Sequence, residues 1–224
     1  MANEVISALI EWTPALIAGL GQNVLISVTA MALGSIAGLL IGALNFSPFR
    51  GFARVWVQVF RNAPWLVLIY FTTYVFPFEI KVFGQYLTFP DWLKVTLGLA
   101  LPASANVAEI LRGAVGSIPA TQWEAAKSLA FTPTQVFTQI ILPQCFKRML
   151  PPWMNLYAII TMGTSLASLV GVHDVIDVAQ IASNTVNRIP FTLLIYVSLL
   201  ALFFAWCYPI SRYTQRLERR YAFR

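Results

Sequence analysis

Few residues in this 224-residue sequence have the types and spacing that covalent chemistry requires. The single histidine, His173, excludes a histidine-rich metal or haem centre, and two cysteines, Cys145 and Cys207, cannot build a disulfide framework, so we expect free thiols. The sequence contains no Gly-x-x-x-x-Gly-Lys-Ser/Thr phosphate loop, no Gly-x-Ser-x-Gly elbow and no His-Glu-x-x-His pair. We therefore assign no catalytic residue, no metal site and no cofactor site to this chain.

Polar side chains inside apolar segments are the remaining functional candidates. Thr164, Ser165 and Ser168 lie close together in an apolar stretch, where their hydroxyl groups could line a translocation path. Polar side chains in apolar helices more commonly form hydrogen bonds between helices, and this holds for Asn23 and Thr161 as well. Interhelical hydrogen bonding is the main interpretation, and the three hydroxyl residues stand as candidates for the path as the alternative.

Two further patterns favour packing over chemistry. Glu109 and Arg112 lie three residues apart, so they can pair on one helical face near a membrane surface. Gly34, Gly38 and Gly42 are spaced by four residues, which lets a second helix approach that face closely. Helix packing is the main interpretation of these glycines, and a moving gate interface is the alternative.

The elements that must position these residues belong in a membrane. The sequence is 58% apolar and only 11% charged, with a mean hydropathy of +0.70. A soluble domain usually has about 25% charged residues because its whole surface meets water. The composition excludes disordered, collagen-like, disulfide-scaffold and ordinary soluble-enzyme classes, and it indicates an integral membrane protein.

Five apolar stretches are long enough to cross a bilayer as helices, which requires roughly 20 residues each. They cover about residues 16–44, 65–83, 92–111, 153–172 and 191–211, which predicts an all-α polytopic bundle forming one domain over residues 1–224. Pro64 suits the start of the second helix, and Pro102 predicts a kink in the third. Glu4 and Glu11, with no basic residue before the first stretch, argue against a cleaved signal peptide.

The basic residues predict the orientation of these spans. Twelve of the 15 lysines and arginines fall in the first and third connections and the C-terminal tail. Because basic residues concentrate in cytoplasmic loops, this distribution places the N-terminus outside and the C-terminus in the cytoplasm. The tail arginines can also contact anionic lipid.

The third connection, residues 112–152, is predicted to be structured. Thr121 with Glu124, and Thr132 with Gln135, each have the spacing of a capping box at a helix start. Two short helices are expected over about 122–129 and 133–141, with Pro143 ending the second. Such a pair could lie on the lipid headgroups or serve as a docking element for another protein.

This connection resembles the EAA loop of type I ABC importer permeases, specifically the branch that imports histidine, glutamine, glutamate, arginine and opines. The resemblance extends over about residues 15–220 and includes Arg61-Asn62-Ala63-Pro64, Ile118-Pro119, Gln122-Trp123-Glu124-Ala125-Ala126, Ile141-Leu142-Pro143-Gln144, Leu150-Pro151-Pro152, Thr164-Ser165-Leu166 and Leu217-Glu218-Arg219-Arg220. It implies a coupling surface that includes Glu124, Ala125, Ala126, Leu129, Ala130, Leu142 and Pro143. It also implies that Glu109 and Arg112 brace this loop.

The family resemblance implies a transport subunit of the bacterial inner membrane rather than an enzyme. Such a permease imports a polar or charged amino acid by alternating access, beside a second permease subunit that we expect to be non-identical. Two partner ATP-binding subunits bind and hydrolyse ATP with Mg²⁺, and a periplasmic or lipid-anchored binding protein delivers the substrate. Membrane lipid surrounds the chain, and no nucleic-acid partner is expected. The alternative is an ion-coupled secondary amino acid transporter, which would require intramembrane carboxylates near mid-span.

Two positions depart from the family pattern. Ala130 stands where the family usually has glycine, so a left-handed backbone at this turn would cost about 1 kcal/mol. Met162 and Gly163 replace a charged pair that many members have before Thr-Ser-Leu. Apolar groups at that level favour a permease that shares its substrate path with a second, different subunit.

Overall fold

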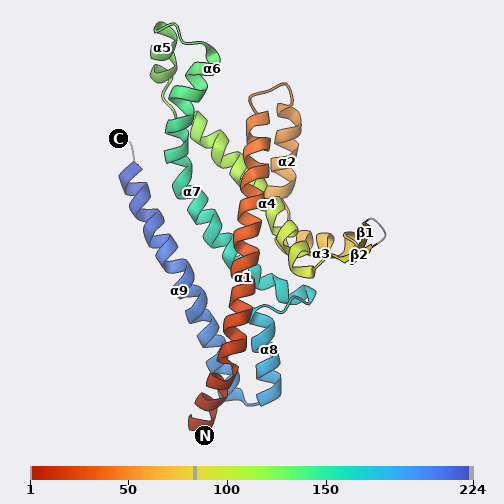
Figure 1. Ribbon diagram of the computed structural model, residues 1–224. Helices are drawn as coiled ribbons and strands as arrows, with labels where there is room; N and C mark the ends of the chain where they lie inside the picture. Colours follow the sequence, from red (N-terminus) through yellow and green to blue (C-terminus); the bar gives the residue numbers. More distant parts are fainter. Residues whose placement is uncertain (1, 83–84, 222–224) are drawn as a thin grey trace.

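The computed structural model describes residues 2–82 and 85–221, and its main mass is an elongated bundle of helices (Figure 1). The longest helix, α1 (Ala2–Leu44), runs beside α4 (Asp91–Gly116), α7 (Leu142–Gly163) and α9 (Ile189–Tyr221). The two ends of the chain lie toward opposite ends of the molecule (Figure 1). This all-helical bundle agrees with the class expected from the sequence.

Three stretches of the described chain are helical, long and apolar enough to cross a membrane: Glu4–Leu44, Pro133–Val170 and Ile189–Tyr221. The helix α4 has 26 residues but includes Asp91, Lys94, Glu109 and Arg112, so it is less apolar than these three. The helix α3 (Trp65–Val75) is apolar but has only 11 residues. The prediction of five complete spans therefore remains a prediction.

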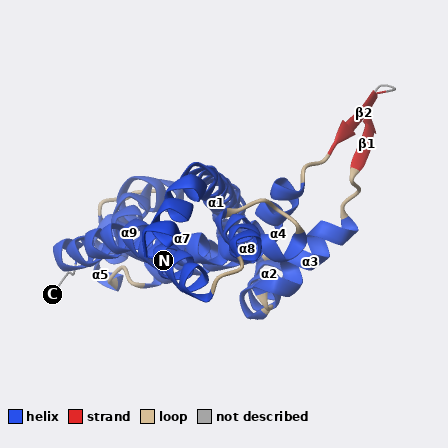
Figure 2. Ribbon diagram, turned by 90° about the horizontal axis from the view of Figure 1, so that it is seen from below, coloured by secondary structure: helices blue, strands red, loops and turns tan. Residues whose placement is uncertain are grey.

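The second predicted span, residues 65–83, is wrong beyond residue 75. After α3 the chain forms an antiparallel hairpin of β1 (Glu79–Val82) and β2 (Gln85–Thr88), which projects sideways from the bundle (Figure 2). Phe83, the last residue of the predicted span, lies outside the described residues. The helix ends at Val75 because Pro77 follows: Phe76, the residue before this proline, has an extended backbone (φ −76°, ψ 137°), and proline has no N–H with which to continue the helix.

The connection before α3 contains an amphipathic helix, α2 (Arg50–Asn62), that the sequence analysis did not predict. Ala53 and Val57 on one face of α2 are buried against α1 and α4. The indole of Trp56 donates a hydrogen bond of 3.0 Å to Ser104 Oγ on α4. A window of about 20 residues misses such a helix, because its three arginines interrupt the apolar run.

The glycines of α1 bring it into close contact with α4. A methyl group at Gly34 would lie 2.5 Å from Ala103 Cβ, and one at Gly38 would lie 2.5 Å from the Ser104 carbonyl oxygen. At Gly42 the nearest atom would be 2.9 Å away, on Leu111. Real side chains do not approach so closely, so the packing role expected for these glycines is confirmed.

The connection from α7 to α9 folds back along the bundle. A 3-10 segment, η2 (Thr164–Val170), follows α7, and α8 (Val175–Val186) then lies beside the first half of α1 (Figure 1). A buried cluster joins α1, α8 and α9, and it includes Leu16, Val175, Ala179, Phe191 and Ile195. This cluster is separate from the central one between α1, α4 and α7.

Candidate functional site

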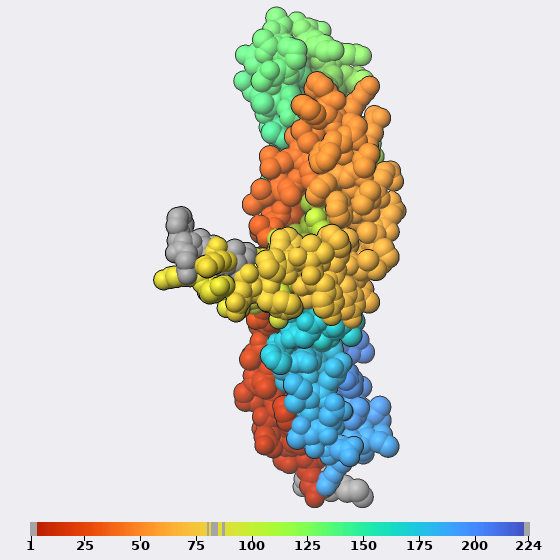
Figure 3. Space-filling view, turned by 90° about the vertical axis from the view of Figure 1, so that its right-hand side faces the viewer, coloured from red at the N-terminus to blue at the C-terminus, as the bar shows by residue number. Residues whose placement is uncertain are grey.

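The connection from α4 to α7 forms a helical projection at one end of the molecule. It consists of α5 (Ala120–Ser128), one short turn of helix α6 (Pro133–Gln135) and the π-helix η1 (Val136–Ile141), which leads directly into α7. In Figures 1 and 3 this part extends past the ends of α1 and α2. We call residues 117–141 the projecting segment.

Both predicted helices of this segment exist, but two details of the prediction are wrong. The N-cap of α5 is Pro119, and no side chain caps this helix, so Thr121 and Glu124 do not form a capping box. Ala120 is a good helix former, and its helical conformation starts the helix before Thr121. Pro143 does not end the second helix, because the chain stays helical from Pro133 to Gly163.

The π-helix explains how Pro143 is accommodated. The N–H of Leu142 donates to the carbonyl of Phe137, five residues back, so the hydrogen-bond register is already widened where the proline enters. Proline lacks an N–H and is tolerated in the first turn of a helix. Pro143 therefore lies at the start of α7 rather than after an end.

The second capping box is confirmed. Thr132 is the N-cap of α6, and its Oγ1 accepts a hydrogen bond of 3.3 Å from the Gln135 N–H. The Gln135 side chain in turn accepts a hydrogen bond of 2.9 Å from the Thr132 N–H. The residue between the two helices, Ala130, has φ of 57°, so the turn keeps the left-handed conformation although it lacks glycine.

An apolar cluster fixes the projecting segment to the bundle. Residues from α4, α5, η1 and α7 share this cluster: Leu111, Ala114, Val115, Ile118, Ala126, Val136, Ile141, Cys145 and Met149. Trp123, Phe131 and Phe137 pack against it. Because buried side chains interdigitate at near-crystalline density, the segment is coupled mechanically to both α4 and α7.

The outer surface of the projecting segment combines charge with exposed apolar groups. Glu124, Ala125 and Ala130 are exposed, and the Leu129 side chain is 72% exposed. Leu142 and Pro143, at the start of α7, are exposed as well, whereas Ala126 is buried in the apolar cluster. Six of the seven predicted coupling residues are thus exposed, and Ala126 holds the helix in place.

Glu109 lies close to two arginines near the base of this segment. Its carboxylate accepts a hydrogen bond of 2.8 Å from Arg112 Nε, which confirms the predicted pair. Arg61 from α2 lies 3.6 Å from the same carboxylate. Glu109 therefore links α2 to α4, a contact that the sequence spacing alone does not reveal.

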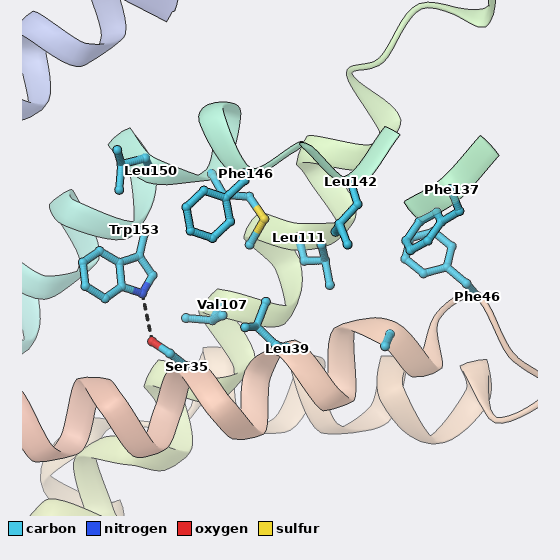
Figure 4. A pocket seen from close by; sticks show the side chains of 12 residues that line it. Ser35, Leu39, Phe46, Val107, Leu111, Phe137, Leu142, Phe146, Leu150 and Trp153 are labelled. Carbon is cyan, nitrogen blue, oxygen red and sulfur yellow. Dashed lines mark hydrogen bonds between the residues drawn. The ribbon is translucent and has the colours of Figure 1, made fainter. Parts of the chain in front are cut away.

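A largely apolar cavity of about 540 Å³ opens between α1, α4 and α7 (Figure 4). Leu39, Val107, Phe146 and other apolar side chains line it. The indole Nε1 of Trp153 donates a hydrogen bond of 2.8 Å to Ser35 Oγ at its edge. Such a lining offers little to a charged solute, which requires polar partners.

Thr164, Ser165 and Ser168 lie in η2, and their environments differ. Thr164 is fully buried, and its Oγ1 accepts a hydrogen bond of 3.0 Å from the Asn23 side chain on α1. Ser165 and Ser168 are partly exposed and donate to carbonyls of their own chain segment. Of the three candidates for the path, Thr164 is thus the one with an interhelical partner.

Asn23 also binds the start of α8. Its Nδ2 donates to Asp174 Oδ2 at 3.1 Å, and its Oδ1 accepts from the Val175 N–H at 3.0 Å. Asp174 is fully buried and caps α8 by accepting from the Asp177 N–H at 2.9 Å. We call Asn23, Thr164 and Asp174 the polar node; sequence analysis singled out Asn23 and Thr164 separately, but nothing in their spacing relates them to Asp174.

Comparisons with known proteins identify a family and several relatives of this chain. Residues 13–222 match the family described as the binding-protein-dependent transport system inner membrane component. The probable amino-acid ABC transporter permease protein YckA of Bacillus subtilis (strain 168) is 30% identical over 216 residues, which cover 95% of this chain and 92% of YckA. The octopine transport system permease protein OccM of Rhizobium radiobacter is 31% identical over 172 residues, 74% of this chain and 70% of OccM.

Solved structures of ABC transporters have a fold similar to that of this chain. A crystal structure of an amino acid ABC transporter with histidines matches with a TM-score of 0.83 and 26% identity, covering 95% of this chain and 96% of that chain. An inward-facing structure of the MetNI methionine ABC transporter matches with a TM-score of 0.69 and 16% identity, covering 93% of this chain and 96% of that chain. The second likeness, at this identity, concerns the fold alone.

Proposed function

Because the chain belongs to the family of binding-protein-dependent transport system inner membrane components, we propose that its projecting segment is where a partner ATPase drives transport. The chain is a permease subunit of an amino-acid ABC transporter. The ion-coupled alternative has no support among these relatives.

The observation that carries the proposal is the projecting segment itself. Its exposed face presents Glu124 and Leu129, while its inner face shares one apolar cluster with α4 and α7. A partner that moves this segment would move both helices, since a packed core transmits displacement rather than absorbing it. The bundle would then alternate between a form open to one side of the membrane and a form open to the other.

The partners follow from the same proposal. Two ATP-binding subunits would bind ATP and Mg²⁺, and an external binding protein would deliver the amino acid. A second permease subunit, different from this chain, would complete the path. The apolar pair Met162-Gly163 supports a different second subunit, because these residues give a charged substrate no partner at that level.

We propose a polar or charged amino acid, or a close derivative, as the substrate. Ser165 and Ser168 remain the candidates on this chain for the path, because their side chains are partly exposed. Thr164 would act through Asn23, since its hydroxyl is buried against that residue. The relatives are named for several different amino acids, so they support amino acids as the substrate class but do not identify which amino acid this chain transports.

The proposed orientation places the projecting segment in the cytoplasm of a bacterium and the N-terminus outside its inner membrane. The distribution of basic residues supports this orientation, and the positions of the two chain ends in Figure 1 agree with an odd number of crossings. We propose that the five crossings lie within α1, the apolar stretch that begins at α3, α4, α7 and α9, with the arginines of α2 at the cytoplasmic end.

The experiment that tests the coupling proposal is Glu124→Lys in the reconstituted transporter. We expect amino acid uptake to fall by about tenfold or more, because a reversed charge at a docking surface removes attraction and adds repulsion. The control is Glu11→Lys, the same change on an exposed residue near the N-terminal end of α1, far from the projecting segment. Normal uptake by a Glu124→Lys protein that inserts and assembles would contradict the proposal.

A further inference from the structure

At the base of the projecting segment, one side chain from α7 forms hydrogen bonds with the residue that ends α4. Arg148 Nη1 donates a hydrogen bond of 2.8 Å to the carbonyl oxygen of Ser117 and one of 3.1 Å to Ser117 Oγ. Ser117 is the C-cap of α4, the point at which the chain leaves the bundle for the projecting segment. The contact therefore joins the residue where the segment departs to the helix by which it returns.

The local chemistry favours an arginine here. The last carbonyls of a helix have no partner within the helix, and a cation at this end also interacts favourably with the helix dipole. The hydroxyl of Ser117 donates to the Ala114 carbonyl at 2.7 Å, so its lone pairs are available to accept from the guanidinium. Arg148 is half-buried, which protects the contact partly from water.

We propose that Arg148 is a positioning residue that transmits motion of the projecting segment to α4 as well as to α7. This inference rests on the proposed coupling function of that segment. The apolar cluster beneath the segment transmits displacement through packing, but hydrophobic contacts are non-directional and do not by themselves set the orientation of one helix end relative to another. The two hydrogen bonds from Arg148 fix the direction of the α4 terminus relative to α7.

The surroundings connect this contact to other moving parts. A recess beside Arg148 is lined by Ser117, Pro151 and Pro152, together with Glu218 and Tyr221 near the end of α9. Glu109, which links α2 to α4, lines the adjacent recess. α7 and α9 thus meet beside the α4 terminus, and the last turns of α4 also contact α2 through Glu109.

The test measures the amount of amino acid transported per ATP hydrolysed in the reconstituted complex. Arg148→Gln should leave assembly with the ATPase intact but lower this ratio by about fivefold or more. Arg148→Lys, which retains the charge and one donor, should restore part of the ratio. Lys147→Gln is the matched control, because Lys147 is the exposed basic neighbour on the same helix.

The outcomes separate this inference from the coupling proposal. A normal ratio in Arg148→Gln together with uncoupling in Glu124→Lys would overturn the role of Arg148 alone. Normal transport in both variants would overturn the coupling proposal as well. If neither Arg148 variant inserts and assembles, the residue serves folding and the inference is rejected.

Discussion

Two segments of this molecule each connect two long helices, but one extends away from the bundle and the other packs against it. The projecting segment (117–141) and the segment of residues 171–188 each return the chain from one long helix to another. The first extends away from the bundle and leaves Leu129 exposed, whereas the second lies along α1 with Val175, Ala179 and Ala182 fully buried. The exposed surface of the projecting segment is available to a partner protein. The 171–188 segment instead buries its apolar residues within the bundle and stabilises it.

The turns of the two segments also differ in strain. The 171–188 segment places Gly171 and Asn187 at its left-handed positions, with φ of 83° and 48°. These residue types adopt that conformation at low cost. The projecting segment uses Ala130 at φ of 57°, so its turn is the strained one. The contrast indicates that α8 is fixed tightly to the bundle and that the turn of the projecting segment is the less stable of the two.

The largest expected effect comes from breaking the polar node that fixes α8. Asn23→Ala would leave the buried Asp174 carboxylate without one donor and the Val175 N–H without its acceptor. We expect a loss of about 3 kcal/mol in the free energy of unfolding, because each unsatisfied buried group costs about 1–3 kcal/mol. Thermal unfolding in detergent would measure it, with Asn184→Ala on the exposed face of α8 as the control. Equal stability of the two variants would show that the node does not fix α8.

The next effect concerns the close contact between α1 and α4. Gly38→Ala would place a methyl group 2.5 Å from the Ser104 carbonyl oxygen, so α1 and α4 must separate. We expect about 2 kcal/mol of destabilisation from overpacking. Gly21→Ala on the same helix is the matched control, since the added methyl would have no atom of another element within 4 Å. If both alanines behave alike, the close contact between α1 and α4 does not stabilise the fold.

The fold was predictable where a local pattern determines it. The apolar stretches gave α1, α7 and α9, and the glycine spacing gave the face of α1 that contacts α4. The hairpin at residues 79–88 and the helix α2 were missed, because short elements with charged residues fall below the length that hydropathy detects. The helix through Pro143 was missed because a π-helix has no simple sequence pattern.

The candidate site was predictable in its position but not in its contacts. Capping residues and the family resemblance located the projecting segment, and Thr132 with Gln135 form the predicted box. The contact between Arg148 and Ser117 joins residues 31 positions apart, and the one between Asn23 and Asp174 joins residues 151 positions apart. Such pairs depend on tertiary packing, which no local spacing encodes.

A smaller effect of opposite sign should appear at the strained turn. Ala130→Gly removes the clash of Cβ in a left-handed backbone, so we expect a gain of about 1 kcal/mol. Ala125→Gly, on the exposed face of α5, should instead lose about 1 kcal/mol, because glycine is unfavourable inside a helix. Thermal unfolding of both variants measures the pair. Changes of the same sign would refute the view that this turn is the strained one.

The smallest effect should come from the exposed ion pair at the end opposite the projecting segment. Arg188 Nη1 donates to Glu4 Oε2 at 2.9 Å, but both side chains are more than half exposed. Water and salt screen such pairs, and ordering two long side chains opposes their attraction. Arg188→Gln should therefore leave the midpoint of thermal unfolding unchanged at physiological salt. A clear decrease would show that this surface contact, in addition to the buried node at Asn23, stabilises the packing of α1 against the segment that contains α8.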